Sequence, residues 1–522
     1  MIELLEQQKK LTANQWKLIA TANLADLLDF FDFFLIGYVL AFITKEWQLT
    51  YWQGAVILLS SGLGAVPGAF FWGWVADRIG RRKVFISTAL NVALATGVMY
   101  FKPGPNCWVA GWIFLSVMRF FVGIGNAGLI TVDMPLVQEF MPAYKRGWVS
   151  VLTTTLLPAG NLLGGVAGWL LAPVIGWRGL FLIGLVPVVL VLMIRYWVPE
   201  SPRWLIRMGR HEDARKSLAW ALQIDPREIN LPATLPEAEN VRWRELFKYP
   251  RSVAAACLTG LTQTGGAGLL LWQTTLFVLV LKVTPAEASY LVIWVSLVAI
   301  IGRFFVMALI EPLGRRGSGV LCCLAAAAAI SVAGYMADVY IGAASLFFVM
   351  ILVTAFFGSG NYSIVGPYMA EVWPTRLRTS GMGLGYGIGN MGKIIGPLGL
   401  ALIAGSTDYI SPKATLDALG PAFLYFGSWW ILGAIAFWFI GFETKGRTSR
   451  RWIARLRSRR HHSRGCRPRN VGRFSSRAAA ANRKPHRKKL SRLGNEAKRT
   501  LVTTSPCLAL RTTIGSAIGA RG

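Results

Sequence analysis

Three aspartates lie close together in an apolar stretch near the start of the chain. Asp26, Asp29 and Asp32 follow one another at intervals of three residues. Helical neighbours three apart differ by about 60° in direction, so the three carboxylates can share one broad face. A carboxylate inside a membrane costs about 2.5–3.5 kcal/mol on insertion scales, and such groups often belong to ion pathways or proton relays. We expect Asp29 and Asp32, and less directly Asp26, to handle protons or substrate. The alternative is a structural hydrogen-bond network or a helix end among lipid headgroups.

Further charged residues interrupt other apolar stretches. Arg119 opens RFFVGIGNAG, and Asp133 follows fourteen residues later. Because arginine stays charged, Arg119 must meet a carboxylate, a substrate anion or backbone carbonyls. Arg119 could pair with one of the three aspartates near the start of the chain until that aspartate is protonated, or it could form a fixed ion pair with an aspartate. Lys393, inside GNMGKIIGPLG, could attract a carboxylate substrate or serve a structural role. Arg303 is a third interior cation, of a kind that is more often structural.

The composition around these residues is that of a membrane protein. The chain has 522 residues, of which 54% are hydrophobic and only 15% charged, against about 25% charged in soluble domains. This excludes a soluble enzyme and disorder over the whole length. The six cysteines include no C-x-x-C pair, so we predict neither a disulfide framework nor a metal site.

Apolar runs long enough to cross a bilayer recur along the chain. About 20 residues are needed for each crossing. The runs lie near 19–43, 52–75, 83–101, 108–134, 147–171, 178–198, 252–281, 288–310, 317–336, 343–367, 378–405 and 419–441. We therefore predict an all-α polytopic membrane protein with about twelve transmembrane helices in two pseudo-symmetric six-helix bundles. No cleavable signal peptide is expected within residues 1–17.

The predicted organisation has four parts. Residues 1–198 form the first bundle, 199–250 a cytoplasmic central loop, 251–448 the second bundle and 449–522 a basic, disordered tail. Within the loop, His211–Leu222 has apolar residues at helical spacing and should lie along the cytoplasmic face. Basic residues gather in alternate short loops, so we expect both termini in the cytoplasm. The expected location is the plasma membrane. The basic residues of these loops are Arg78, Arg81, Arg82, Lys83, Lys145, Arg146, Arg315, Arg316, Arg376 and Arg378.

The two halves repeat each other in sequence. GWVADRIGRR at Gly73–Arg82 has a degraded echo in MALIEPLGRR at Met307–Arg316, an offset of 234 residues. Separately, E-x-x-P-x-x-x-R occurs from Glu139 to Arg146 and again from Glu371 to Arg378, an offset of 232. Two motifs at nearly one offset indicate an internal duplication. Such repeats are typical of secondary transporters, whose substrate site lies at the midplane between them.

These motifs resemble those of the major facilitator superfamily of transporters over about residues 15–448. The G-x-x-x-D-R-x-G-R-[RK] signature stands at Gly73–Arg82, and R-x-x-x-G-x-G begins at Arg119. PESPRWL (Pro199–Leu205) and ETKGRT (Glu443–Thr448) resemble the sugar-porter branch, whereas LLDFFDFFLIG resembles the motif of aromatic-acid:proton symporters. The resemblance implies a monomeric metabolite:proton symporter that works by alternating access. The expected substrate is a small organic acid, which can be aromatic. One alternative is a sugar or polyol as substrate, and another is a membrane sensor that kept the fold and lost transport.

The resemblance also implies a set of residues that gate the cytoplasmic side. In the family such charges act as a latch, because pairs at a membrane boundary are partly desolvated and can bias two arrangements of the domains. The expected set is Gly73, Asp77, Arg78, Gly80, Arg81, Arg82, Glu139, Arg146, Glu200 and Arg203 in the first half, with Glu311, Arg315, Arg316, Glu371, Arg378 and Glu443 in the second. The alternative is that these charges only follow the positive-inside rule.

No cofactor, enzyme activity or specific nucleic-acid partner is expected. Gly123–Gly128 and Gly387–Gly392 fit G-x-G-x-x-G, yet both lie inside apolar runs and favour close helix packing over dinucleotide binding. The tail holds 21 Lys and Arg and one acidic residue, Glu496, so it carries +20 of the net +30. Codons for Ser449–Trp452, shifted by one nucleotide, give the family's Leu-Glu-Glu-Met, so the tail is interpreted as a frameshift product. It could otherwise bind anionic lipid or nucleic acid.

Overall fold

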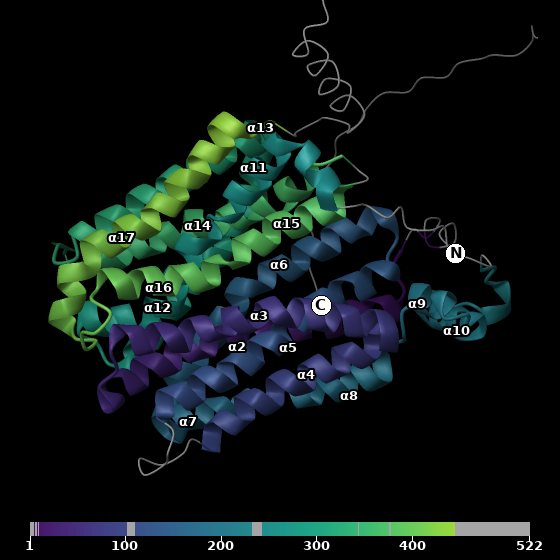
Figure 1. Cartoon of the computed structure of the whole chain (residues 1–522), viewed down its shortest axis with the longest axis horizontal. Coiled ribbons are helices and arrows are strands. Elements are labelled where there is room, and N and C mark those ends of the chain that lie inside the picture. Colours follow the sequence, from purple (N-terminus) through teal and green to yellow (C-terminus); the bar gives the residue numbers. More distant parts are fainter. Residues whose placement is uncertain are drawn as a thin grey trace, which may run out of the picture. The chain divides into compact units, whose positions relative to one another are not determined.

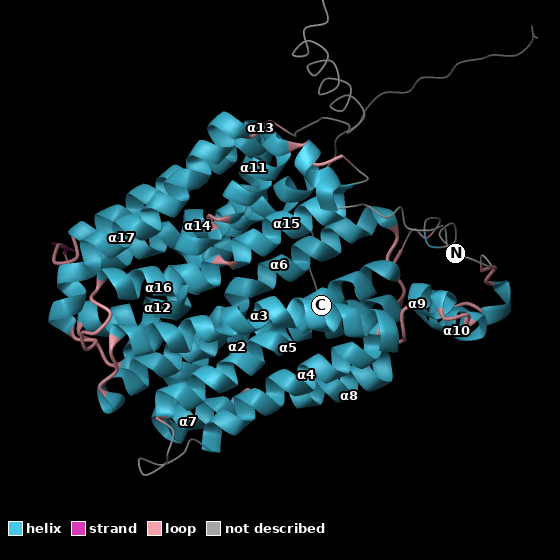
Figure 2. Ribbon diagram, in the orientation of Figure 1, coloured by secondary structure: helices cyan, strands magenta, loops and turns pink. Residues whose placement is uncertain are grey.

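Long helices account for nearly all of the regular structure. The computed structural model describes residues 5, 8, 10–101, 110–231, 243–342, 344–374 and 377–443, which belong to one unit of the chain, Met1–Ile453. The predicted tail, residues 449–522, and Arg376 lie outside the described residues, and the side chain of Arg146 is not described. Figures 1 and 2 show the helices running mostly lengthwise, side by side.

The first half contains six crossings and a small polar extension. Its helices are α2 (Ala13–Trp47), α3 (Tyr51–Ile79), α4 (Arg81–Val98), η1 (Met99–Phe101), α5 (Gly111–Glu139), α6 (Ala143–Val166), η2 (Ala167–Leu171), α7 (Ala172–Ile183) and α8 (Pro187–Trp197). The extension follows as α9 (Pro202–Arg207), α10 (His211–Leu222), η3 (Pro226–Glu228) and η4 (Trp243–Lys248). The structure confirms the helix predicted at His211–Leu222.

The second half repeats this plan. Its helices are α11 (Pro250–Gly260), α12 (Gln263–Leu281), α13 (Pro285–Tyr335), α14 (Leu346–Glu371), α15 (Arg378–Asn390), α16 (Gly392–Ile403), α17 (Pro412–Ile435) and η6 (Ala436–Ile440). A two-stranded hairpin, β1 (Tyr340–Ile341) and β2 (Ala344–Ser345), pairs Tyr340 with Ser345. Helices α2, α3 and α13 each begin with a threonine cap. The threonine side chain and that of the Gln or Glu three residues later each bond the other's backbone amide, which fixes where the helix starts.

Nine stretches of the described chain are long and apolar enough to span a membrane. Two of the nine contain a sharp break at a glycine with positive φ, Gly176 (φ 71°) and Gly314 (φ 74°), so each covers two crossings. The α15–α16 segment, residues 378–403, supplies the twelfth crossing. The prediction of an all-α polytopic membrane protein with about twelve spans is therefore confirmed, and the break at Gly314 coincides with the echo of the Gly73–Arg82 motif.

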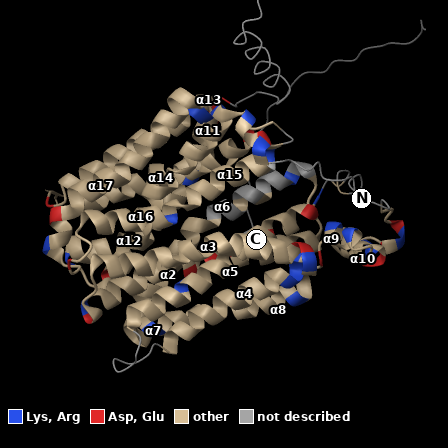
Figure 3. Ribbon diagram, in the orientation of Figure 1, with Lys and Arg blue, Asp and Glu red and all other residues tan. Residues whose placement is uncertain are grey.

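The two halves meet along three pairs of helices, and charges gather at the helix ends. Helix α2 packs against α12, α3 against α16 and α6 against α13. Close approach is possible because glycines face the partner: a Cβ on Gly37 would come within 2.7 Å of the Leu271 carbonyl oxygen. Figure 3 shows Lys, Arg, Asp and Glu mainly near helix ends, with few in the middle. We call the end that carries Arg81, Arg82, Arg315 and Arg316 the charged end.

Loops from both halves join at the opposite end of the bundle, which we call the far end. The loop between α2 and α3 pairs with the loop between α16 and α17 through backbone hydrogen bonds. The Ile410 amide donates to the Leu49 carbonyl at 2.9 Å, and the Tyr51 amide donates to the Asp408 carbonyl at 3.1 Å. The Tyr51 hydroxyl also lies 2.6 Å from the Thr415 hydroxyl. The halves are thus held together at the far end.

Candidate functional site

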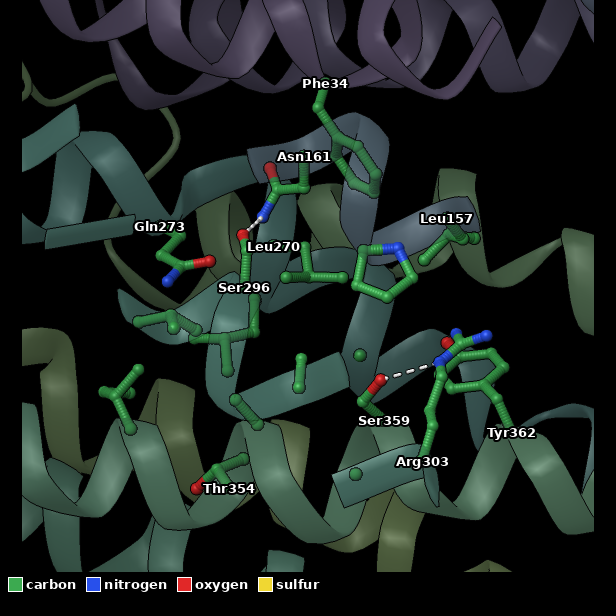
Figure 4. Close-up of a pocket in the computed structure, with 18 of the residues that line it drawn as sticks. Phe34, Leu157, Asn161, Leu270, Gln273, Ser296, Arg303, Thr354, Ser359 and Tyr362 are labelled. Atoms are coloured by element: carbon green, nitrogen blue, oxygen red, sulfur yellow. Dashed lines mark hydrogen bonds between the residues drawn. The ribbon is translucent and has the colours of Figure 1, made fainter. Parts of the chain in front are cut away.

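A largely apolar cavity lies between the two halves. Helices α2, α6, α12, α13, α14 and α17 all contribute to its walls. Figure 4 shows the side chains around it. Polar or aromatic groups in the walls are Phe34, Asn161, Gln273, Ser296, Arg303, Thr354, Ser359, Tyr362 and Trp430. A cavity between repeats with a few convergent polar groups has the form of a small-molecule site.

Arg303 supplies a positive charge to this cavity. Its side chain is 3% exposed, and its Nε donates a hydrogen bond of 2.9 Å to the Ser359 hydroxyl. The guanidinium lies 5.6 Å from the ring centre of Tyr362, within the range of a cation–π contact. These two neighbours hold the guanidinium at the wall, as Figure 4 shows. An arginine so placed can bind a carboxylate through paired N–H donors.

Two carboxamides line the cavity, and they differ in their bonding. Asn161 donates to the Ser296 hydroxyl at 3.1 Å and accepts from the Tyr38 hydroxyl at 3.0 Å. Gln273 is 1% exposed, yet neither its amide nitrogen nor its amide oxygen has a hydrogen-bond partner among the described residues. Gln273 was missed at the sequence level. The only available signal was a polar amide beside Trp272 in an apolar run.

Asp32 and Arg119 form an ion pair inside the first half. The Arg119 Nη1 donates to Asp32 Oδ2 at 3.0 Å, and Thr96 donates to Asp32 Oδ1 at 2.6 Å. Arg119 also donates to the carbonyls of Asp32 and Phe33, at 3.0 and 3.2 Å. The structure therefore shows Arg119 paired with Asp32, which agrees with both alternatives for this arginine, a pair that breaks on protonation and a fixed pair. Neither residue is among those that line the cavity.

Asp29 lies between this pair and a cation of the other half. It is 5% exposed, and its Oδ1 has no hydrogen-bond partner among the described residues. Asp29 interacts electrostatically with Lys393 and, more weakly, with Asp32 and Asp133. The Lys393 ammonium lies 4.7 Å from the ring centre of Phe33. The structure thus brings the predicted carboxylate and the predicted lysine together across the boundary between the halves.

Asp26 and Asp133 lie nearer the charged end of the first half. Both are buried, and together with Asn23 they line a small gap between α2, α5 and α6. All six predicted proton or substrate residues are therefore grouped along α2, α5 and α16, and none lines the larger cavity. Arg303, which sequence reasoning ranked as structural, is the charged side chain that does line it.

The predicted gating residues form two similar clusters at the charged end. In the first half Arg81 pairs with Glu139, and Glu200 accepts hydrogen bonds from the backbone amides of Arg81 and Arg82, at 2.8 and 3.1 Å. In the second half Arg315 pairs with Glu371 at 2.6 Å, and Glu443 accepts from the amides of Arg315 and Arg316. These ion pairs and amide contacts each lie within one half.

Two glycines make these clusters possible. Gly80 has φ 101° and Gly314 has φ 74°, and a Cβ at either would come within 2.4 or 2.5 Å of the facing glutamate oxygen. The same geometry in both halves matches the repeat seen in the sequence. Among the other gating candidates, Arg78 stacks over Trp74 at 3.8 Å and the Asp77 carbonyl accepts from the Trp204 indole. Gly73 lies near the end of α3, Arg203 and Arg378 lie at the starts of α9 and α15, and Glu311 precedes the break at Gly314 in α13.

The two G-x-G-x-x-G segments lie within helices. Gly123–Gly128 belongs to α5, and Gly387–Gly392 spans the junction of α15 and α16. A Cβ on Gly123 would come within 2.0 Å of the Ser61 carbonyl oxygen, and one on Gly392 within 2.7 Å of the Thr264 backbone. These glycines therefore permit close helix packing, as the sequence indicated.

Comparisons with known proteins agree with this architecture. A profile of the family described as "Sugar (and other) transporter" matches residues 18–451. The chain is 28% identical over 396 residues to the niacin transporter NiaP of Acinetobacter baylyi, covering 73% of this chain and 86% of that protein. It is 27% identical over 403 residues to a putative niacin/nicotinamide transporter of Bacillus subtilis, covering 76% and 90%.

Solved structures show the same fold. The inward-open xylose transporter XylE from E. coli superposes with a TM-score of 0.65 at 18% identity, covering 84% of this chain and 99% of that one. A bacterial homologue of the lysosomal transporter Spinster, inward-facing and unoccupied, gives 0.65 at 16% identity, covering 82% and 97%. These relatives are transporters and not enzymes. The chain is a multi-pass membrane transporter that belongs to the sugar (and other) transporter family of the major facilitator superfamily.

Proposed function

We propose that the protein is a symporter that couples the transport of a small aromatic carboxylate to protons by alternating access. The observation that carries the substrate class is the buried Arg303, the charged side chain in the wall of the largely apolar cavity between the halves. Arginine binds carboxylates through directed N–H donors, and a cavity with few polar groups disfavours a sugar, whose hydroxyls each need a partner. The names of the niacin transporter relatives support an aromatic acid.

Proton coupling is proposed for the aspartates of α2. Asp29 is the main candidate because it is buried, has no hydrogen bond at Oδ1 from any described residue and faces Lys393 of the other half. Protonation would remove its attraction to Lys393 and so loosen one contact between α2 and α16. Asp32 and Arg119 keep this part of α2 fixed to α5. Asp26 and Asp133 would pass the proton toward the charged end, which we place in the cytoplasm together with both termini.

The transport cycle would exchange two arrangements of the halves around the cavity. The far-end loops are joined in this structure, and the two ion pairs described at the charged end, Arg81–Glu139 and Arg315–Glu371, each lie within one half. This is the arrangement expected when the cavity is open toward the charged end. The opposite state would separate the far-end loops and bring the gating residues of the two halves together. We propose that one chain in the plasma membrane suffices for this cycle.

Uptake into proteoliposomes tests this proposal. Protein truncated after Thr448 would be given labelled benzoate, nicotinate or glucose, with and without an imposed pH gradient. The expected result is gradient-dependent uptake of the acids, which Arg303→Gln lowers at least tenfold and Arg303→Lys lowers less. Arg178→Gln, at an exposed site in α7, is the matched control. Uptake of glucose alone would favour the sugar alternative, and binding of an acid without uptake would favour a sensor.

A further inference from the structure

The amide of Gln273 is an unusual feature of the cavity. It is 1% exposed on α12, and both its donor and its acceptor are unpaired among the described residues. Buried polar side chains nearly always have a hydrogen-bond partner, and an unpaired one costs about 1–3 kcal/mol. The other carboxamide of the cavity, Asn161, is bonded to Ser296 and Tyr38. Gln273 therefore has a hydrogen-bonding capacity that the described part of the protein does not use.

The position of this amide relative to Arg303 suggests what would use it. The two side chains come from different helices, and Figure 4 shows them apart, with Leu270 between them in the view. A single small ligand that reached both would need a carboxylate at one point and a second polar atom at another. Most of the other residues that line the cavity are apolar, so the connecting part of the ligand would be a hydrocarbon framework.

Aromatic side chains and missing Cβ atoms favour a flat framework. Tyr362 and Trp430 line the cavity. Gly266 and Gly358 give their rings room, because a Cβ on Gly266 would come within 2.9 Å of the Tyr362 hydroxyl and one on Gly358 within 3.0 Å of Trp430. Rings pack well against aromatic faces in such walls.

We propose that Gln273 selects aromatic acids that carry a second polar atom on the ring, either a ring nitrogen or a hydroxyl. The amide N–H donates to a ring nitrogen, and the amide oxygen accepts from a ring hydroxyl. An unsubstituted arene carboxylate leaves the amide unpaired and binds more weakly, as in other sites where a polar group is built to meet a ligand hydroxyl or amine. This inference rests on the proposed function and specifies the substrate class of the same cavity.

Competition experiments test the selection. Uptake of labelled nicotinate would be competed with unlabelled nicotinate, 3-hydroxybenzoate and benzoate. For the unchanged protein, the two ring-substituted acids should compete about tenfold better than benzoate, which corresponds to one hydrogen bond. Gln273→Met should bring the three acids within about twofold of one another, with benzoate unaffected. Gln263→Met, the same change on the same helix outside the cavity wall, should keep the preference.

The outcomes separate the two proposals. Equal competition by all three acids in the unchanged protein, or an unchanged preference in Gln273→Met, overturns the role of Gln273 and leaves aromatic-acid transport standing. Lack of uptake of any acid by the unchanged protein overturns the proposed function and this inference with it. If Gln273→Met does not reach the membrane, Gln273→Asn keeps the amide but moves it by one methylene, and it should also lose the preference.

Discussion

The guanidinium of Arg119 and the carboxylate of Asp32 meet 3.0 Å apart, and both side chains are completely shielded from solvent. Arg119 comes from α5 and Asp32 from α2, so the pair joins two helices of the first half. Thr96 of α4 bonds the second carboxylate oxygen, which adds a third helix. This pair therefore fixes the part of α2 that places Phe34 at the cavity and Asp29 opposite Lys393.

Removing one partner of this pair should destabilise the protein. Arg119→Met leaves a buried carboxylate and Asp32→Leu leaves a buried guanidinium, and each change should cost about 3–5 kcal/mol. The double variant should lose less than either single variant, because no charge remains unpaired. Thermal unfolding in detergent, followed by tryptophan fluorescence, measures this. Additive losses in the double variant would show that the pair contributes nothing as a unit.

Asp29→Asn should uncouple transport from protons without disturbing the fold. The replacement has nearly the same shape, and Oδ1 of Asp29 has no hydrogen bond to lose among the described residues. Accumulation driven by a pH gradient should disappear, while exchange of labelled for unlabelled substrate should continue at a similar rate. Asp213→Asn, on the exposed face of α10, is the control. Undiminished accumulation in Asp29→Asn would assign the proton to another group.

A disulfide across the far end should stop transport reversibly. Thr50 and Tyr409 form an antiparallel bridge, so their Cα atoms lie at a separation suited to a disulfide. Thr50→Cys combined with Tyr409→Cys should abolish uptake under oxidising conditions, and a reducing agent should restore it. The two single variants control for the native cysteines. Full uptake by the cross-linked protein would mean that the far end does not open during transport.

Alanine at Gly80 or Gly314 should lower stability at the charged end. Each glycine has a positive φ, and an added Cβ would clash with Glu200 or Glu443. A loss of about 1–3 kcal/mol is expected for each residue forced into such a conformation. Gly366→Ala, where a Cβ meets nothing within 4 Å, should have no such effect. Equal melting temperatures for all three variants would contradict this account of the two glycines.

Asp77→Asn should impair transport without preventing insertion into the membrane. The Asp77 side chain is exposed at the end of α3, so the fold does not depend on burying its charge. If the gating residues meet across the halves when the far end opens, the lost charge should weaken that state and slow uptake. Membrane abundance and uptake would be measured together. Normal uptake at normal abundance would remove Asp77 from the latch.

Sequence patterns predicted the helices and the repeat better than the cavity. Apolar runs and the Gly80 and Gly314 motifs act locally, so their periodicity and spacing are visible along the chain. The grouping of Asp29 with Lys393 depends on how α2 meets α16, yet each residue was conspicuous as a charge in an apolar run. Gln273 gave no comparable signal, because an uncharged amide in a helix is common, and its unpaired state depends on five other helices.

The type of contact that closes the far end limits what this end of the molecule can recognise. The closure is made largely by amides and carbonyls, such as those of Leu49 and Ile410, which carry no net charge and are the same whatever the residue. Such a seam cannot sense a proton or tell one solute from another. The substrate must then be recognised in the interior of the bundle before the far-end loops separate. These loops can therefore change in sequence without changing which substrates the protein binds.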